Sequence, residues 1–136
     1  MIETPAAVLD ASALIAYVRN EPGASEVRKA FHKEVAISAV NWAEVLSKLA
    51  DAGFDPGVTS RTLREQAPIG PALAIWPFDE QLAQDVAHLR EQTKRFGLSL
   101  GDRACLALGL FLKVPILTAD RRWGDLKLRV TLRFIR

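Results

Sequence analysis

Four short apolar runs, separated by segments with helical periodicity, restrict the fold of this chain more than any other feature. Residues within each run are apolar at successive positions rather than at alternate ones, which is typical of strands covered on both faces. Strands that alternate with helices predict a parallel sheet, because a crossover helix returns the chain to the start of the next strand. We therefore predict an α/β domain whose central parallel sheet has helices on both faces. The runs cover residues 6–9, 35–37, 74–76 and 114–117.

Capping residues mark the ends of the predicted helices. Ser38, Asp79 and Ser99 each precede a helical segment and have side chains that N-caps use. Gly53 and Gly97 follow two of these segments, at the position where a left-handed residue commonly ends a helix. The predicted helices cover residues 12–18, 25–33, 39–52, 55–67, 80–96 and 100–113.

Two segments depart from the helix pattern. Residues 68–71 contain two prolines and a glycine, which predicts a turn. Residues 128–134 alternate between apolar and polar side chains, which predicts a strand with one solvated face.

The length and the cysteine count limit the class of protein. We expect one domain over residues 1–136, with a core large enough to need no disulfide bonds. Cys105 is the only cysteine, which excludes an internal disulfide and a zinc site built from several cysteines. No apolar run approaches the roughly 20 residues of a membrane span, and no basic leader precedes an apolar stretch. We expect a cytoplasmic protein that has no membrane partner.

The net charge of +2 conceals an uneven distribution. Residues 121–136 contain six basic residues and one acidic residue, a net charge of +5, so the first 120 residues carry −3. Such a basic segment attracts a polyanion such as nucleic acid, and Arg121 and Arg122 are candidate substrate contacts. The same charges on an edge strand would deter aggregation, and both interpretations remain open.

Four carboxylates follow the predicted strands. Asp10 comes directly after the first run, and Asp120 follows the fourth. Glu44 lies in the helix entered from the second run, and Asp102 lies in the first turn of the last predicted helix. Ligands of parallel sheets bind at the carboxyl ends of the strands. The four side chains can therefore meet at one rim of the sheet.

Each carboxylate also has a purely structural interpretation. Asp10 and Asp120 are typical of turns and caps, and Asp102 would complement the dipole of its helix. Glu44 lies opposite the apolar stripe of its helix, so it is either solvated or faces a cleft. None of these structural roles requires the four side chains to meet, and their joint placement favours a functional site.

A divalent cation would resolve the repulsion within such a cluster. Neighbouring carboxylates raise one another's pKa, and Mg²⁺ or Mn²⁺ removes the conflict because these ions prefer oxygen ligands. Such an ion activates water and stabilises charge on a phosphodiester. Ser12 and Thr118, each two residues from a carboxylate, are candidates to orient ligands or water. Asn41, one helical turn before Glu44, is a third candidate.

The four acids stand within motifs that resemble the PIN-domain pattern, in the order and spacing of that family. Within the family the chain is similar to the VapC toxins, which are the ribonucleases of bacterial type II toxin–antitoxin pairs. The resemblance covers almost the whole chain. The motifs are Val8-Leu9-Asp10-Ala11-Ser12-Ala13-Leu14, Asn41-Trp42-Ala43-Glu44-Val45, Leu98-Ser99-Leu100-Gly101-Asp102-Arg103-Ala104 and Leu117-Thr118-Ala119-Asp120.

The resemblance implies a PIN-like three-layer fold with about five parallel strands. It also implies cleavage of RNA that depends on Mg²⁺, with Mn²⁺ as a substitute, and a bacterial, cytoplasmic location. The implied partners are an RNA substrate of the tRNA or rRNA class, a small VapB-type antitoxin and a second copy of the chain. Arg103 stands where many relatives have a small apolar residue, which makes it a candidate substrate contact. The resemblance gives metal-binding and catalytic roles to Asp10, Glu44, Asp102 and Asp120, and supporting roles to Ser12 and Thr118.

Two other functions are compatible with parts of the sequence. A haloacid-dehalogenase-like phosphatase would use Asp10 as its nucleophile, but that chemistry typically needs a second aspartate two residues later, where this chain has Ser12. The other alternative is a PIN-like module that binds RNA or protein and has an idle site. The presence of all four acids argues against an idle site.

Overall fold

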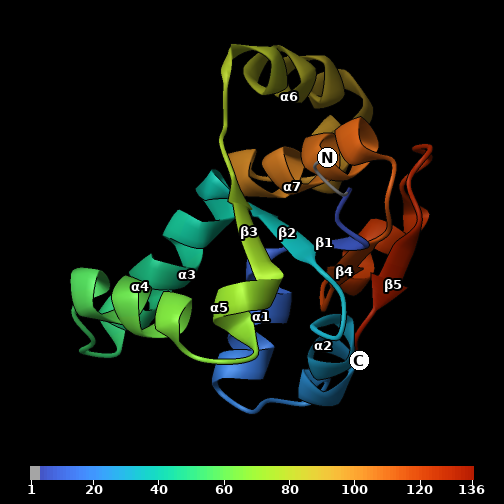
Figure 1. Ribbon diagram of the computed structural model, residues 1–136. Coiled ribbons are helices and arrows are strands. Elements are labelled where there is room, and N and C mark those ends of the chain that lie inside the picture. Colours follow the sequence, from blue (N-terminus) through green and yellow to red (C-terminus); the bar gives the residue numbers. More distant parts are fainter. Residues whose placement is uncertain (1–3) are drawn as a thin grey trace.

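The computed structural model describes residues 4–136, which form a parallel sheet between two layers of helices (Figure 1). The strands are β1 (Ala7–Leu9), β2 (Val35–Ser38), β3 (Leu73–Trp76), β4 (Ile116–Thr118) and β5 (Leu132–Phe134). Their order in the sheet is β3-β2-β1-β4-β5, and all neighbouring pairs are parallel. The predicted α/β fold with about five parallel strands is confirmed.

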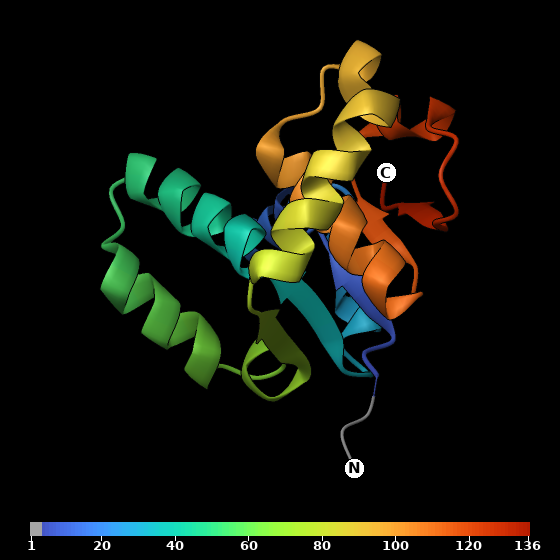
Figure 2. The same ribbon diagram turned by 90° about the horizontal axis from the view of Figure 1, so that it is seen from above.

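The helices divide between the two faces of the sheet. The view from above separates α6 and α7 from the long α3–α4 pair (Figure 2). Two short 3₁₀ segments, η1 (Lys94–Phe96) and η2 (Arg121–Asp125), complete the described helical structure. The α-helices are α1 (Ala11–Val18), α2 (Ala24–Ala30), α3 (Ala39–Asp51), α4 (Pro56–Glu65), α5 (Ile69–Ala72), α6 (Glu80–Thr93) and α7 (Leu100–Leu112).

The predicted caps occupy the ends of these helices. Ser38, Asp79 and Ser99 each accept a hydrogen bond from a backbone N–H of the helix that follows. Gly53 and Gly97 have positive φ angles of +97° and +68°, as expected for residues that end a helix.

Two hydrophobic clusters cover the two faces of the sheet, which explains why its strands are apolar at successive positions. Leu9, Ile37 and Leu117 belong to the cluster formed with α1 to α5. Val8 and Ile116, their neighbours along the strands, belong to the cluster formed with α6 and α7. Cys105 and Trp123 are fully buried in this second cluster, as expected for core residues.

The turn predicted at residues 68–71 is present only at Pro68, because residues 69–72 form the short helix α5. The N–H of Gly70 donates to the carbonyl oxygen of Gln66 at 2.7 Å, and a side chain at position 70 would collide with the backbone of Arg64. Glycine allows the helical turn to approach the end of α4 this closely.

The last strand is shorter than its alternating sequence predicts. Only residues 132–134 pair, because β4 offers three residues as partners. Leu128 and Val130 still pack against the cluster on the α7 side. The alternation of apolar and polar residues therefore reflects burial that extends beyond the paired residues of β5.

None of the helices within residues 4–136 is long and apolar enough to cross a membrane.

Candidate active site

A cavity of about 360 Å³ lies at the carboxyl ends of β1 and β4. Its walls come from α1, α3, the first turn of α7 and the residue that begins η2. The structure therefore brings together side chains from segments that are more than 100 residues apart along the chain. Six of the predicted site residues line the cavity: Asp10, Ser12, Asn41, Glu44, Asp102 and Asp120.

Asp10 is the most buried of the four carboxylates, with 6% of its surface exposed. Its Oδ1 accepts hydrogen bonds from Ser12 Oγ at 2.7 Å and from the N–H of Ala13 at 2.8 Å. Its Oδ2 accepts one from Thr118 Oγ1 at 2.5 Å. These bonds cap α1 and join the carboxyl ends of β1 and β4. The carboxylate is thus held in one orientation at the base of the cavity.

The surroundings of Asp10 disfavour its negative charge. Burial raises the pKa of Asp10 from 3.8 to about 6, although the hydrogen bonds from Thr118, Ser12 and Ala13 oppose this shift. The negative charge of Asp102 raises the pKa further. The two carboxylates are therefore near enough to interact, as the sequence predicts for acids that share one rim.

Ser12 and Thr118 connect Asp10 to the segment that follows β4. Ser12 Oγ accepts a hydrogen bond from the N–H of Ala119 at 3.0 Å, and Thr118 Oγ1 accepts one from the N–H of Asp120 at 3.0 Å. Each hydroxyl thus donates to Asp10 and accepts from the backbone beside Asp120. This network fixes the separation of the two strand ends.

Glu44 faces the cavity because α3 and α7 approach closely at Gly101. The side chain of Asn41 donates to Glu44 Oε1 at 2.7 Å and to the carbonyl oxygen of Gly101 at 2.9 Å. A Cβ at position 101 would lie 2.6 Å from Glu44 Cδ and 2.7 Å from Glu44 Oε2. The absence of a side chain at Gly101 therefore makes room for the carboxylate.

Asp102 stabilises the start of α7 and also lines the cavity. Its Oδ2 accepts a hydrogen bond from the N–H of Ser99 at 2.9 Å, and its own N–H donates to Ser99 Oγ at 3.1 Å. This reciprocal pair is a capping box at the start of α7. The structural interpretation of Asp102 is thus correct, and it does not exclude a second role in the cavity.

Asp120 is held by its neighbour Arg122. The guanidinium donates to both carboxylate oxygens, with Nη2 2.6 Å from Oδ2 and Nε 3.0 Å from Oδ1. These hydrogen bonds lower the pKa of Asp120 below 3.8. Asp120 also caps η2, because its Oδ1 accepts from the backbone N–H of Arg122.

The donor set of the cavity fits a hard divalent cation, although the acids do not form a closed cluster. Within residues 4–136, no three His, Cys, Asp or Glu side chains meet in an arrangement that could hold a metal ion. The carboxylates instead accept hydrogen bonds from neighbouring groups of the protein. Among residues 4–136, the buried Oδ1 of Asn41 has no hydrogen-bond partner, and Asp10 lies in a site that disfavours its charge. Both features, and a donor set made of oxygen atoms, suit Mg²⁺ or Mn²⁺.

None of the three arginines predicted to contact substrate lines the cavity. Arg103 donates to the carbonyl oxygen of Val86 in α6 at 3.1 Å. Arg121 donates to the carbonyl oxygen of Arg136 at 2.7 Å and lies over the ring of Phe134. Neither residue lines the cavity, and the third arginine is bound to Asp120.

Three basic residues that the sequence analysis did not single out for the site do line the cavity: Arg19, Lys48 and Arg136. Lys48 lies four residues after Glu44 on α3. This spacing, which places both residues on one face of the helix, is the sequence signal that could have identified Lys48. Arg136 reaches the cavity through tertiary contacts, because it donates to Glu21 Oε1 at 3.4 Å and to the carbonyl oxygen of Pro22 at 2.8 Å.

Comparison with known proteins identifies a family and several solved structures with a similar fold. The model of the PIN domain family matches residues 7–127. No curated protein sequence matches the chain.

Several solved structures share the fold. A toxin–antitoxin complex from Klebsiella pneumoniae aligns with a TM-score of 0.71 and 18% identity, covering 96% of this chain and 98% of that one. FitAcB from Neisseria gonorrhoeae aligns with a TM-score of 0.69 and 22% identity, covering 95% and 97%. VapC20 from Mycobacterium tuberculosis, a toxin that cleaves the sarcin–ricin loop, aligns with a TM-score of 0.69 and 11% identity, covering 92% and 98%.

Proposed function

The chain belongs to the PIN domain family, and from this premise we propose that it is a cytoplasmic, Mg²⁺-dependent endoribonuclease that acts as the toxin of a type II toxin–antitoxin pair. The observation that carries the proposal is the single cavity that collects all four acids. The fold that the chain shares with toxin–antitoxin complexes and with an RNA-cleaving toxin supports it.

The carboxylates divide into two groups by their surroundings. Asp10 and Asp102 would hold the principal ion, because the charge of one already raises the pKa of the other. Glu44 and Asp120 would complete the acidic pocket and position the attacking water. When bound, Mg²⁺ lowers the pKa of water and neutralises charge on the phosphodiester, and Mn²⁺ can replace it.

The other residues of the site hold these carboxylates in place. Ser12 and Thr118 fix Asp10 through both of its oxygens, and Asn41 fixes Glu44. In the reaction, a water oxygen would add to phosphorus, a carboxylate of the pocket would accept a proton of that water, and the ester oxygen that leaves would take up a proton from solvent. The proposed reaction needs no protein nucleophile, which distinguishes it from the phosphatase alternative, in which Asp10 would attack phosphorus.

Basic side chains at the cavity would bind the substrate backbone. Arg19, Lys48 and Arg136 line the same cavity as the acids. Positive charge beside the pocket compensates for the repulsion between the carboxylates and the RNA phosphates.

Cleavage of RNA by the purified protein tests the proposed reaction. We expect structured RNAs of the tRNA and rRNA classes to be cut in Mg²⁺ or Mn²⁺ and to remain intact in EDTA. Asp10→Asn and Asp102→Asn should abolish cleavage, whereas Asp51→Asn, at an exposed position at the end of α3, should leave it unchanged. Cleavage that persists in EDTA or in both site variants would contradict the metal mechanism. Binding of RNA without any cleavage would favour the idle module.

An apolar groove next to the cavity is the site that we propose for the antitoxin. The groove, of about 500 Å³, lies between α1, α3 and α4. Two of its residues are large and exposed, Phe54 at 58% and Val58 at 52%. Arg19 lines both the groove and the acidic cavity. An antitoxin segment in the groove would therefore reach the active site.

Two variants with a charge on an exposed phenylalanine test the groove. We expect Phe54→Asp to weaken binding to the small protein encoded beside this gene, measured by calorimetry, and to relieve its inhibition of cleavage. Phe111→Asp serves as the control, because Phe111 is 53% exposed and lies on α7, away from the groove. Equal binding by both variants would place the antitoxin elsewhere.

We also propose that two copies of the chain associate. Sedimentation of the purified protein, with and without the antitoxin, measures this directly, and a mass of one chain at micromolar concentration would contradict the homodimer.

A further inference from the structure

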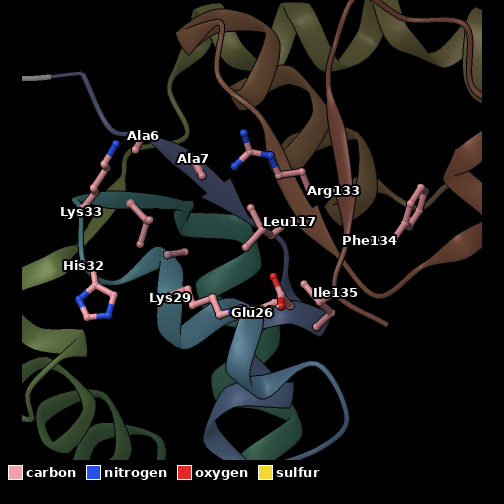
Figure 3. A pocket seen from close by; sticks show the side chains of 12 residues that line it. Ala6, Ala7, Glu26, Lys29, His32, Lys33, Leu117, Arg133, Phe134 and Ile135 are labelled. Atoms are coloured by element: carbon pink, nitrogen blue, oxygen red, sulfur yellow. Dashed lines mark hydrogen bonds and ion pairs between the residues drawn. The ribbon is translucent and has the colours of Figure 1, made fainter.

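A second cavity of about 360 Å³ lies between α2 and the β1–β4–β5 part of the sheet. It shares no lining residue with the acidic cavity. Its small and apolar lining includes Ala6, Ala7 and Leu117, while long polar side chains surround it (Figure 3). In this view Lys33 and Arg133 extend toward the start of β1 from opposite sides.

The charge around this cavity is almost entirely positive. Lys29, Lys33 and Arg133 line it, together with His32, against the single acidic residue Glu26. Glu26 pairs with Lys29 at 3.2 Å. No salt bridge among residues 4–136 includes Lys33 or Arg133. Two cationic side chains from different elements therefore face one hollow without a carboxylate partner from the described chain.

The fold alone does not explain this arrangement. Charged side chains on an edge strand deter aggregation, and this accounts for Arg133 on β5. It does not account for Lys33, which follows α2 and lies on the other wall of the same cavity.

The basic cavity and the acidic cavity adjoin the same short segment. Ile135 lines the basic cavity, and the next residue, Arg136, lines the acidic one. Consecutive Cα atoms are about 3.8 Å apart. Arg136 thus lines the acidic cavity together with the carboxylates, while the residue before it lines the basic cavity. A strand of nucleic acid that contacts both cavities would therefore pass residues 135 and 136.

We propose that the basic cavity binds a phosphate group. Its walls offer ammonium and guanidinium donors, which bind phosphate oxygens, and its volume admits a phosphate with its attached sugar. The phosphate site does not depend on nuclease activity. Its use for a backbone phosphate of the RNA substrate, rather than for a free phosphate, rests on the proposed function.

Matched charge variants test the phosphate site. The test variant is Lys33→Gln with Arg133→Gln. The control is Arg90→Gln with Lys94→Gln, which makes the same change of charge at exposed positions on α6 and η1. Both are prepared with Asp10→Asn and Asp102→Asn and without metal, so that binding is measured in the absence of cleavage. The probes are inorganic phosphate, followed by amide chemical shifts in NMR, and a single-stranded RNA oligonucleotide, followed by fluorescence anisotropy.

We expect phosphate to shift the amides of residues 32–35 and 133–135 in the parent protein and in the control, and at least tenfold less in the test variant. If the ligand is the RNA backbone, the slope of log affinity against log salt falls by about 0.7 for each lost contact, or about 1.4 in the test variant relative to the control. Loss of phosphate binding with unchanged RNA affinity would assign the site to a free phosphate. Absence of localised shifts in the parent protein would overturn the proposal without reference to any variant. Equal behaviour of test and control variants would also overturn it.

Discussion

At the scale of single residues, Asp10 links the fold to the proposed chemistry. Its hydrogen bonds from Ser12, Ala13 and Thr118 hold two strand ends together, yet its burial disfavours the charge that these bonds stabilise. Binding of a proton or of a cation would neutralise the buried charge of this carboxylate. The free energy of unfolding depends on pH differently in these two cases.

The first prediction concerns the pH dependence of stability in EDTA. Because burial raises the pKa of Asp10 from 3.8 to about 6 in the folded protein, the folded state binds the proton more tightly than the unfolded chain does. The contribution of Asp10 is therefore fully present below pH 4 and is lost as pH rises through 6. Two pKa units correspond to a fall of about 3 kcal/mol in the free energy of unfolding.

Chemical denaturation between pH 4 and 7 measures this contribution. Asp10→Asn should lack the fall, and the control Asp51→Asn should keep it, because Asp51 is exposed. Parallel curves for wild type and Asp10→Asn would show that Asp10 does not titrate in this range.

The second prediction concerns Gly101. In Gly101→Ala the new methyl group would displace the carboxylate of Glu44, which is the end of a flexible side chain. We expect stability to be kept or increased by up to about 1 kcal/mol, since alanine favours a helix. We expect cleavage of RNA to fall by about 100-fold, since a carboxylate displaced by about 1 Å loses its catalytic position.

Gly57→Ala in α4 is the matched control for Gly101. Its Cβ would meet only Asp55 Oδ2, at 3.3 Å. Thermal unfolding and initial rates of cleavage, measured for both variants, separate the two effects. Equal activities would mean that the position of Glu44 is unimportant.

At the scale of elements, the turn between α1 and α2 fastens the segment after β5. Gly23 has a φ of +98°, and a Cβ there would lie 2.8 Å from both the carbonyl oxygen and Cγ1 of Ile135. Next to this contact, the side chain of Arg136 donates to the carbonyl oxygen of Pro22. These contacts place the side chain of Arg136 at the acidic cavity and place Ile135 in the wall of the basic cavity.

The third prediction compares two glycines with the same backbone conformation. Gly53 has a φ of +97° and nothing within 4 Å of the position of a Cβ. Gly53→Ala should cost about 1–2 kcal/mol of stability through backbone strain alone. Gly23→Ala should cost a further 1–3 kcal/mol, approximately, because it also collides with Ile135. Denaturant unfolding measures the loss of stability in each variant. Equal losses would show that Ile135 moves aside without strain.

Much of the arrangement of elements is predictable from the sequence, because caps and apolar runs are local signals. Ser38 and Ser99 begin their helices as expected, and the strands are apolar at successive positions because both faces of the sheet are covered. The presence of the four acids around one cavity is predictable from their positions after strands and at helix starts.

Tertiary contacts explain what the sequence does not predict. Arg136 is held at the cavity by hydrogen bonds to Glu21 and Pro22, which are more than 110 positions away in the chain. Arg103 stands beside Asp102 in sequence, but successive residues of a helix point in different directions, and its side chain bonds to α6. The shortness of β5 is set by β4, its partner.

At the scale of the whole molecule, the near-neutral net charge is the sum of two opposed regions. The acids of the cavity and the basic residues around the last strand largely cancel in the total. Binding of a divalent cation would shift this balance and make the surface more attractive to a polyanion.

The fourth prediction is that Mg²⁺ and Mn²⁺ stabilise the folded protein. A ligand that binds only the folded state at 100 times its Kd adds about 2.7 kcal/mol. We expect thermal unfolding of the wild type to shift upward with ion concentration. The variant with Asp10→Asn and Asp102→Asn should show no shift, and Asp51→Asn should match the wild type. A shift of the same size in the double variant would place the ion elsewhere.

The order of the strands has a further consequence, for the synthesis of the protein. β1 pairs with β4, and Asp10 accepts its hydrogen bond from a threonine 108 residues later in the chain. A nascent chain therefore exposes Asp10 long before Thr118 and Asp120 exist to complete the site. If the chain is a ribonuclease, a ribosome that translates its message is safe from the unfinished product. The topology thus delays completion of the acidic cavity until translation has passed Asp120.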